Sequence, residues 1–337
     1  MYNAFVKLRN YLYSHNMLKV YSSAYPVISI GNISSGGSGK TPCALMIAKI
    51  CKDNFIQVSL LSSGYKRTSK GICTVSSSYT MHNDIMPEQC GDEVYMQALS
   101  GYYHSVIVSQ PKYKALSQFT TPIIIDDGFQ HRAIKRDCNI VLLHSSDLKG
   151  NVFPWGTLRE SLDALLRADI IICTDSFPLK DIEPYIKHKP LVCKSTIRVG
   201  SLYPLYDSSA IHISNSLPKI SSIYALSGIA NPSRFHISLQ EKGFIIKSSK
   251  VLNDHAHYTE HIISKIIKEM KQEDLYTLIT TEKDAVKLFR FRSIFEQNSI
   301  QCFVLPITFD IIEGKHEFLL SLQTVLTTTF TKTTTSL

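Results

Sequence analysis

The segment from residue 27 to residue 42, VISIGNISSGGSGKTP, limits what this chain can fold into more than any other. The apolar run Val27–Ile30 predicts a buried strand, and the glycine-serine loop after it ends in GKT at residues 39–41. The next apolar segment, Ala44–Ile50, predicts a helix. Because a phosphate-binding loop needs a strand, a glycine-rich loop, Lys-Thr and a helix in this order, the segment predicts an α/β domain that binds phosphate groups.

The chemistry of phosphate binding assigns roles within this loop. Backbone N–H groups of the loop and of the helix start converge on an anion, and glycine allows close approach and positive φ. Lys40 reaches the β- and γ-phosphates of a nucleotide, and the Thr41 hydroxyl ligates Mg²⁺. The strict pattern has glycine where this chain has Ser34, so we expect Gly36 and Gly37 to supply the flexibility. A glycine-rich turn that binds nothing is the alternative. The expected nucleotide contacts are Ser34, Ser35, Gly36, Gly37, Ser38, Gly39, Lys40 and Thr41.

Short apolar runs recur after this segment, separated by helix-like or loop segments. Continuous apolar runs that alternate with helical segments predict a parallel sheet covered on both faces. We therefore predict an α/β fold, with a P-loop NTPase-like parallel sheet core and a second, smaller α/β domain joined by a β-strand linker. The expected core strands are Val27–Ile30, Val58–Leu61, Val106–Val108, Ile123–Ile125, Ile140–Leu143 and Ile170–Cys173.

The pattern changes near residue 190. Two short extended runs around Gly200, within Leu191–Asp207, predict a β-hairpin or a paired-strand connector. New α/β units follow, with strands expected at Tyr224–Ser227, Phe244–Lys247, Leu278–Thr281 and Phe303–Leu305 and a helix at His261–Gln272. The expected division is an amphipathic N-terminal helix at 1–20 as part of the core, the phosphate-loop core at 21–190, a β-hairpin-like linker at 191–215, the smaller α/β domain at 216–325 and a frayed tail at 326–337.

The net charge of +8 suits an anionic partner such as a nucleotide, a phosphorylated substrate or an acidic lipid, and a mildly basic surface without a partner is the alternative. The chain has no arginine-rich tract or interleaved basic-aromatic motif, so we expect no nucleic-acid partner. None of the eight cysteines forms a C-x-x-C pair, which is typical of reduced cysteines in a cytosolic protein. We expect no membrane-spanning helix, because no apolar run approaches the ~18–20 residues that such a helix needs. We expect no signal peptide, because the N-terminus lacks an apolar h-region and a small-residue cleavage site.

Residues 1–20 predict an amphipathic helix. Lys7, Arg9 and Lys19 interrupt or flank its apolar side. Such a helix can lie in a membrane interface, or it can pack on its own domain, which composition alone favours. The apolar side carries Phe5, Leu8, Tyr11, Leu12 and Leu18.

The segment Thr121–Arg132, TPIIIDDGFQHR, is the second strong signal. An apolar strand that ends in Asp is the Walker-B arrangement, which places a carboxylate beside the phosphate loop to hold Mg²⁺. Asp126 and Asp127 cannot both point the same way from an extended backbone, so we expect only one of them to face the metal. An Asp-Asp-Gly turn without a metal is the alternative.

Five weaker motifs also carry polar groups. CGDE at 90–93 precedes a helical pattern and by itself predicts a helix N-cap. PWGTLRES at 154–161 holds Arg159 and Glu160, which suit either phosphate and metal contacts or a surface ion pair. DHAHYT at 254–259 lacks the further ligands of a zinc site. TTEKDAVKL at 280–288 differs from the [NT]-K-x-D of GTPases, which favours ATP over GTP, and SGIANPSRF at 227–235 predicts a strand end followed by a turn.

Together these motifs resemble those of the tetraacyldisaccharide 4′-kinase family of lipid A biosynthesis. GNISSGGSGKTP, GDE, DDGFQHR, PWGTLRES, SGIANPSRF, DHAHYT and TTEKDAVKL occur in the family's order from about Phe5 to about Phe309. The resemblance implies an ATP- and Mg²⁺-dependent kinase that phosphorylates the 4′-hydroxyl of a tetraacyldisaccharide 1-phosphate, an acylated glucosamine disaccharide, to form lipid IVA. It also implies a peripheral protein at the cytoplasmic face of the bacterial inner membrane, bound to the anionic surface through the N-terminal helix and without an obligate protein partner.

The resemblance further implies which residues act on the acceptor. Asp92 of the GDE motif acts with His255 of the DH motif at the acceptor hydroxyl, and Lys40 completes the catalytic set. Because His255 falls in the second domain, this pair is expected to form only on domain closure. The resemblance implies candidate substrate contacts at Arg159, His131 and Asn231.

The family's DD pair falls on Asp126 and Asp127, and its Arg-Glu pair falls on Arg159 and Glu160. The expected metal ligands are therefore Thr41, Asp126, Asp127 and Glu160. From the residues alone, two other classes stay open: a regulatory P-loop nucleotide switch, and a P-loop kinase or ATPase with a soluble substrate. ATP turnover with and without a lipid acceptor discriminates among these classes.

Overall fold

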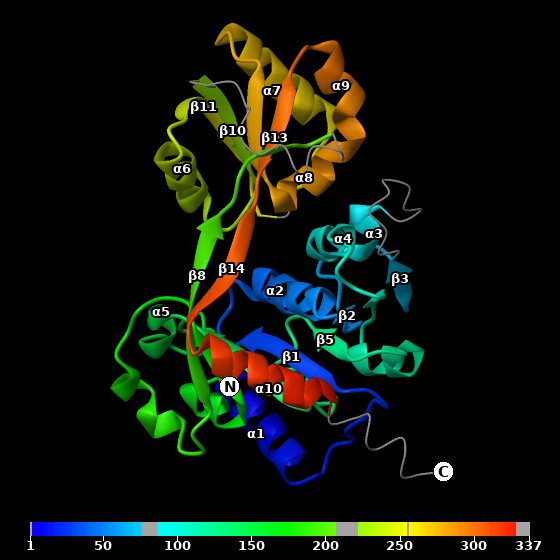
Figure 1. The fold of residues 1–337 in the computed structure, drawn as a ribbon, viewed down its shortest axis with the longest axis vertical. Coiled ribbons are helices and arrows are strands. Elements are labelled where there is room, and N and C mark those ends of the chain that lie inside the picture. The colour runs from blue at the N-terminus through cyan, green and yellow to red at the C-terminus, as the bar shows by residue number, and fades with distance from the viewer. Residues whose placement is uncertain (1, 76–85, 207–221, 255, 328–337) are drawn as a thin grey trace. The chain divides into compact units, whose positions relative to one another are not determined.

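A computed structural model describes residues 2–75, 86–206, 222–254 and 256–327. The chain forms two compact units, which Figure 1 displays as a ribbon. Unit 1 contains residues 1–197 and the chain from Phe309 onward, and unit 2 contains Arg198–Thr308. The chain leaves unit 1 within strand β8 (Leu191–Val199) and returns within strand β14 (Ile307–Glu313).

Within the described residues, the sheet of unit 1 has nine strands in the order β14-β8-β7-β6-β1-β5-β2-β4-β3. The strands from β8 to β4 in this order pair in parallel, and β3 pairs with β4 antiparallel at one edge. The bounds of the remaining strands are β1 (Val27–Asn32), β2 (Ser59–Ser62), β3 (Cys73–Val75), β4 (Val106–Val108), β5 (Ile123–Ile125), β6 (Cys138–Leu143) and β7 (Ile170–Cys173).

The parallel strands of unit 1 are buried on both faces. Val27 and Ile123 are register partners on one face, and Ile28 and Ile124 are partners on the other, and all four are buried. This explains the continuous apolar runs in the sequence, because neither face of these strands contacts water. The predicted α/β fold with a parallel sheet core is confirmed.

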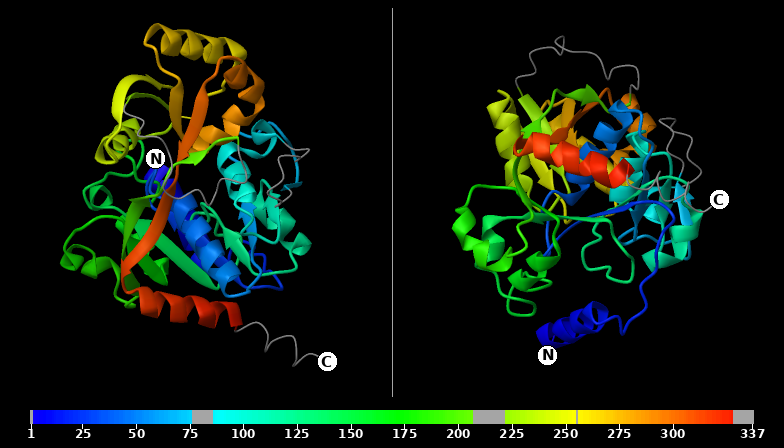
Figure 2. Two further views of the ribbon diagram at one scale, coloured as in Figure 1. Left: turned by 45° about the horizontal axis from the view of Figure 1, so that its top comes forward. Right: turned by 60° about the horizontal axis from the view of Figure 1, so that its bottom comes forward.

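The helices of unit 1 connect and cover these strands, and Figure 2 places α1 and α10 at opposite sides of the unit. Among the helices that the described residues form, none has the length and apolar character needed to cross a membrane. The helices are α1 (Tyr2–Ser14), α2 (Lys40–Asp53), α3 (Pro87–Cys90), α4 (Asp92–Leu99), α5 (Ser145–Leu148) and α10 (Lys315–Thr327), with 3₁₀ helices at Lys112–Gln118, Leu162–Arg167, Leu179–Asp181 and Glu183–Tyr185.

The described part of unit 2 forms a five-stranded sheet in the order β11-β10-β12-β13-β9, covered on both faces. Tyr224 and Leu278 pack on one face in a cluster with α7, and Ala225 and Ile279 pack on the other face in a cluster with α6. The elements are β9 (Tyr203–Pro204), β10 (Ser222–Ser227), β11 (Ile245–Val251), β12 (Thr277–Thr281), β13 (Gln301–Leu305), α6 (Pro232–Glu241), α7 (Glu260–Gln272), α8 (Glu282–Leu288), a 3₁₀ helix at Phe289–Phe291 and α9 (Arg292–Gln297).

The connector between the units differs from the expected hairpin. The two extended runs around Gly200 are β8 and β9, but they belong to different sheets. β8 lies between β7 and β14 in unit 1, whereas β9 pairs antiparallel with β13 in unit 2. The smaller unit therefore ends at Thr308, earlier than the limit of 325 expected from the sequence, because β14 joins the sheet of unit 1.

The two ends of the chain also differ from the expectation. Helix α1 ends at Ser14, not near residue 20, because Asn16 adopts a left-handed conformation (φ 56°). The N–H of Met17 then donates to the carbonyl of Leu12, which is the hydrogen bond of a Schellman helix end. At the other end, α10 extends to Thr327, so residues 326 and 327 of the expected tail are helical, and residues 328–337 lie outside the described residues.

Candidate active site

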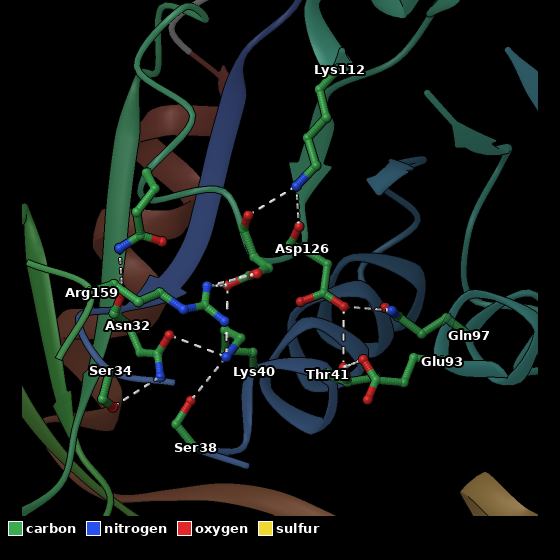
Figure 3. A network of polar contacts seen from close by, with 12 residues as sticks. Asn32, Ser34, Ser38, Lys40, Thr41, Glu93, Gln97, Lys112, Asp126 and Arg159 are labelled. Carbon is green, nitrogen blue, oxygen red and sulfur yellow. Dashed lines mark hydrogen bonds and ion pairs between the residues drawn. The ribbon is translucent and has the colours of Figure 1, made fainter. Parts of the chain in front are cut away.

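The phosphate loop lies at the carboxyl end of β1, next to the end of β5. The two strands are parallel neighbours, with Ser29 opposite Ile125. Because parallel neighbours end at the same edge of a sheet, the loop after β1 meets Asp126 and Asp127, which directly follow β5. Figure 3 shows the polar side chains that converge there.

Two glycines give the loop its path. Gly36 and Gly39 have φ of 128° and 85°, which other residues rarely adopt. Ser34, at the position where the strict pattern has glycine, does not have positive φ; it forms a bridge with Leu158, and its hydroxyl accepts a hydrogen bond from Asn32. The backbone N–H of Ser35 donates to the carbonyl of Thr157 at 2.8 Å, so the PWGTLRES segment holds the start of the loop.

Lys40 lies at the start of α2, directly after the loop. Its Nζ donates to Oδ1 of Asn32 at 3.1 Å and to the hydroxyl of Ser38 at 3.4 Å, and it lies 3.7 Å from Oδ1 of Asp127. These contacts hold the ammonium group at the mouth of the loop. They leave it where the phosphates of a nucleotide would take over as its partners.

Thr41, Glu93 and Asp126 face one another (Figure 3). The Thr41 hydroxyl lies 3.2 Å from Oδ2 of Asp126 and 3.4 Å from Oε2 of Glu93, and Gln97 donates to the same Asp126 oxygen at 2.8 Å. The other oxygen of Asp126 is buried and accepts no hydrogen bond from the described residues. Burial, followed by the charges of Glu93 and Asp127, raises the pKa of Asp126 to about 6.

This group fits a magnesium ion. Mg²⁺ prefers hard oxygen ligands and is usually held by one or two carboxylates together with phosphate oxygens. Thr41, Asp126 and Glu93 supply a hydroxyl and two carboxylates. The Asp126 oxygen that accepts no hydrogen bond is available to coordinate a cation. Within the described residues, no group of three or more His, Cys, Asp and Glu side chains is arranged for a metal.

Asp127 turns away from Thr41 and binds cations. Its backbone adopts φ of 49°, and Nη1 of Arg159 donates to both of its carboxylate oxygens at 2.9 Å. Burial alone would raise the pKa of Asp127, but Lys40, Arg159 and Lys112 lower it to about 2. The pKa values of the two neighbouring aspartates are therefore shifted in opposite directions.

Lys112 supports the turn that carries both aspartates. It is 1% exposed, and its Nζ donates to the backbone carbonyls of Asp126 at 2.6 Å and of Asp127 at 2.9 Å. Burial lowers the pKa of Lys112 to about 8, although the two carboxylates oppose this shift. Two carbonyls that would otherwise be buried without donors are thereby satisfied, which holds the left-handed turn at Asp127.

Glu160, predicted as a metal ligand, has other partners. Its buried Oε2 accepts hydrogen bonds from Asn10 of α1 and from Arg167, both at 2.6 Å, whereas its Oε1 accepts none from the described residues. Arg159, its neighbour, binds Asp127 instead. Glu160 thus links α1 to the core in this structure, and the side chain of Glu93 occupies the place beside Thr41.

Two predicted substrate contacts lie in different surroundings. His131 follows the Asp-Asp-Gly turn, and burial together with Lys112 lowers its pKa to about 3, so its imidazole is neutral. Asn231 belongs to unit 2 and caps α6, where its side-chain oxygen accepts a hydrogen bond from the N–H of Arg234. Arg159 lies at the phosphate loop, beside Asp127.

Asp92 is the first residue of α4, and the N-cap position belongs to Gly91. The N-cap interpretation of the GDE motif therefore shifts by one residue, and Asp92 instead contributes a negative charge to the first turn of the helix. His255, its expected catalytic partner, lies outside the described residues.

Sequence reasoning missed Glu93, Gln97 and Lys112. Glu93 and Gln97 are four residues apart on α4, so a single helix face presents both to Asp126. That spacing was available as a signal. Lys112 carried no signal, because a lysine is rarely buried and nothing local to SQPKYK indicates that this one is.

Comparisons with known proteins agree with this geometry. The family profile described as Tetraacyldisaccharide-1-P 4′-kinase (LpxK) matches residues 1–327. A protein named tetraacyldisaccharide 4′-kinase from Desulfotalea psychrophila is 36% identical over 307 residues, which are 86% of each chain. One of the same name from Aquifex aeolicus is 33% identical over 304 residues, which are 88% of this chain and 90% of that one.

A solved structure is also similar. LpxK from Aquifex aeolicus, crystallised in complex with ATP, matches with a TM-score of 0.76 and 30% sequence identity, over 96% of both chains. The profile match covers nearly the whole chain, and the relatives exceed 30% identity over most of their length. The chain therefore belongs to the tetraacyldisaccharide-1-P 4′-kinase family.

Proposed function

We propose that this protein transfers the γ-phosphate of ATP to the 4′-hydroxyl of a tetraacyldisaccharide 1-phosphate and so forms lipid IVA. The observation that carries the proposal is the convergence of Lys40, Thr41 and Asp126 at the ends of β1 and β5, in a chain of this family. The related LpxK from Aquifex aeolicus was solved in complex with ATP, which supports ATP as the phosphate donor.

The phosphate loop binds and orients the donor. Free N–H groups at the start of α2 point into the loop, where they donate to phosphate oxygens. The ammonium group of Lys40 exchanges its contacts with Asn32 and Ser38 for the β- and γ-phosphates and neutralises charge as the phosphoryl group moves. Asp127 holds Arg159 in position at the same edge, so a second cation faces the transferred group.

Thr41, Asp126 and Glu93 would hold Mg²⁺. When bound, the ion would supply positive charge that offsets the negative charge of the nucleotide phosphates. Asp126 has to be ionised for this role, although its surroundings raise its pKa to about 6. Gln97 helps to keep the carboxylate in place by donating to its Oδ2.

Asp92 and His255 are the proposed groups at the acceptor hydroxyl. Phosphoryl transfer through a loose transition state depends more on orientation of the acceptor than on early removal of its proton. Asp92 accepts the proton of the hydroxyl, and His255 fixes and tunes the carboxylate. The proposal rests on the family motifs GDE and DH.

The experiment that tests the function is phosphate transfer from γ-labelled ATP to lipid disaccharide 1-phosphate in detergent micelles, followed by thin-layer separation. The wild-type protein should give a labelled lipid. Lys40→Ala should give no labelled lipid, although it should unfold at the same temperature as the wild type. ATP hydrolysis that the lipid does not stimulate would instead support a nucleotide switch or a soluble acceptor.

Asp92→Asn separates catalysis from a structural role. Asn keeps the size and polarity of the side chain but cannot accept a proton, so we expect kcat to fall ~10²–10⁴-fold with an unchanged melting temperature. Double mutation with His255→Ala should cost far less than the product of the two single losses, since the two residues act as one unit. Full activity of Asp92→Asn would remove this residue from the catalytic set.

We further propose that the protein binds the cytoplasmic face of the bacterial inner membrane through α1. Phe5, Leu8 and Tyr11 of α1 are 65%, 57% and 55% exposed, and the helix contacts the core through polar groups, such as Asn10 with Glu160. The exposed Trp155 belongs to the loop whose Phe153 packs edge-on against Tyr2 at the start of α1. An exposed apolar stripe beside basic residues suits the surface of an anionic bilayer.

Sedimentation with anionic vesicles tests this membrane surface. Phe5→Ser combined with Leu8→Ser should reduce the bound fraction several-fold and leave ATP binding unchanged, because both side chains are largely exposed and the contacts of Lys40 are made by Asn32 and Ser38. Phe55→Ser is the matched control, since Phe55 is a single apolar residue that is 97% exposed at the end of α2. Equal binding by all three proteins would exclude α1 as the contact.

A further inference from the structure

Three motifs of unit 2 meet at one buried carboxylate. Asp284 of α8 is fully buried and accepts hydrogen bonds from the N–H of Gly228 at 2.8 Å, the hydroxyl of Tyr258 at 3.0 Å and the hydroxyl of Thr281 at 2.8 Å. Nζ of Lys287 lies 3.2 Å from its Oδ1. Gly228 and Tyr258 are 56 and 26 residues from Asp284 in sequence, so this side chain joins SGIANPSRF and DHAHYT to α8.

Gly228 has to be small at this position. A Cβ there would lie 3.0 Å from Oδ1 of Asp284 and 3.4 Å from both the Asn253 carbonyl and the Tyr258 hydroxyl. A side chain would therefore push Asp284 away from the strand end. The glycine of the motif is explained by this close approach, without reference to a ligand.

The same helix holds the turn that precedes Tyr258. The N–H of Ala256 donates to the carbonyl of Asn253 at 2.9 Å and closes the turn. Nζ of Lys283 lies 2.9 Å from Oδ1 of Asp254, and Nζ of Lys287 donates to the Ala256 carbonyl at 3.4 Å. One lysine thus holds the first half of the turn and the other holds the second half.

We name Lys283, Asp284 and Lys287 the α8 clasp. Lys287 lies beside the other two on the helix surface, because it is four residues after Lys283 and three residues after Asp284. Lys287 is 6% exposed and also lies over the ring of Tyr258, 5.0 Å from its centre. It costs free energy to desolvate a buried ammonium and a buried carboxylate. We therefore interpret this pair as a device that fixes the conformation of the neighbouring chain.

We infer that the α8 clasp positions Asp254 and Ala256, the two sequence neighbours of residue 255, for phosphoryl transfer. This inference rests on the proposed function, in which His255, the residue between Asp254 and Ala256, acts at the acceptor hydroxyl. The clasp residues are positioning residues, because they bind the chain on both sides of residue 255. A small displacement of a catalytic group is enough to slow a reaction about 10²-fold, so the clasp has a large effect on rate.

The test is a kinetic double-mutant cycle with Lys287→Met and His255→Ala. Methionine keeps the length of the lysine stem but removes the ammonium group that binds the Ala256 carbonyl. In the wild-type background we expect kcat to fall about 10- to 100-fold, with KM for ATP changed less than about 2-fold. In the His255→Ala background, the same substitution should change kcat less than about 2-fold, because the group that it positions is gone.

The control is Arg292→Met, which breaks an exposed ion pair with Glu296 on α9 of the same unit and should leave kcat unchanged in both backgrounds. An equal fold-loss for Lys287→Met in the two backgrounds would overturn the inference, since that result describes general damage to unit 2. Wild-type kcat in Lys287→Met would overturn it as well.

A second measurement does not depend on activity, so it can test this inference separately from the proposed function. Hydrogen exchange of the peptide at residues 253–258 should accelerate in the double variant Asp284→Asn/Lys287→Met, which leaves no unpaired buried charge, and should not change in Arg292→Met. Unchanged exchange would overturn the clasp whatever the kinetics. If exchange accelerates but the wild type transfers no phosphate to lipid, the clasp holds the turn and the proposed function fails.

Discussion

Asp126 in unit 1 and Asp284 in unit 2 are both buried carboxylates, but their hydrogen bonding is opposite. Both oxygens of Asp284 accept hydrogen bonds, and Lys287 neutralises the charge. Only one oxygen of Asp126 accepts hydrogen bonds from the described residues, and Glu93 brings a second negative charge close to it. The hydrogen-bonding capacity of one buried aspartate is thus satisfied by the protein, and that of the other is not.

The difference teaches how to tell a structural carboxylate from a ligand site. A buried charge that has its full set of donors stabilises the segments that supply them. A buried charge with a missing donor and a like charge beside it destabilises the free protein, and binding of a cation offsets that cost. Asp284 is therefore expected to matter for folding, and Asp126 for ligand binding and rate.

The largest expected effect is on transfer by Asp126→Asn. We expect kcat to fall ~10²–10³-fold, because the amide cannot neutralise a cation. The same change should stabilise the metal-free protein at pH 7 by about 1–3 kcal/mol, since ionisation of a carboxyl whose pKa is raised to about 6 costs stability. Urea unfolding with and without Mg²⁺ measures both parts, and a destabilised Asp126→Asn protein would contradict the comparison.

Asp284→Ala should lower the free energy of unfolding, whereas Asp126→Asn should raise it. Removal of this carboxylate takes the counter-charge away from the buried ammonium of Lys287 and takes the side-chain acceptor away from the Gly228 N–H, which we expect to cost about 3–5 kcal/mol. Urea unfolding at pH 7 without Mg²⁺ is the measurement. Equal stability of Asp284→Ala and the wild type would show that the two aspartates do not differ as argued.

The smallest expected effect concerns pH. Because the folded pKa of Asp126 is about 6, above its ordinary value, the stability that its protonated form contributes is present below about pH 4 and is lost as the pH rises through 6. Activity should follow the reverse course and fall about tenfold per pH unit below 6, since the protonated carboxyl cannot hold the ion. At limiting Mg²⁺, Glu93→Gln should move this acid limit to lower pH, because the Glu93 charge helps to raise the pKa. An unchanged limit would mean that another group controls it.

The sequence predicted the strands of both units closely, and it left the two aspartates unresolved. Residues 126 and 127 both follow the same strand, and nothing local in the sequence says which one faces Thr41. The structure resolves this because Asp127 enters a left-handed turn held by Lys112 and binds Arg159.

Glu160 illustrates the limit of motif reasoning. It is the sequence neighbour of Arg159, and that adjacency suggested a shared role at the phosphates. The two side chains have different partners: Arg159 reaches Asp127, while Glu160 reaches α1 and Arg167. Glu93, one residue after the Asp92 that the motif emphasised, lies beside Thr41 instead.

The sequence by itself determined the strand, the glycine-rich loop and the helix at residues 27–53, because strand burial, positive φ and helix start are local properties encoded within a few residues. It also determined the parallel sheet class and the family motifs. Only the tertiary structure decided which carboxylate meets Thr41, that β8 pairs with β14 and not with β9, and that Lys112 and Asp284 are buried. The physical reason is that these contacts join residues far apart in the chain, such as Thr41 and Asp126 at a separation of 85, and their geometry depends on how strands pair in the sheet.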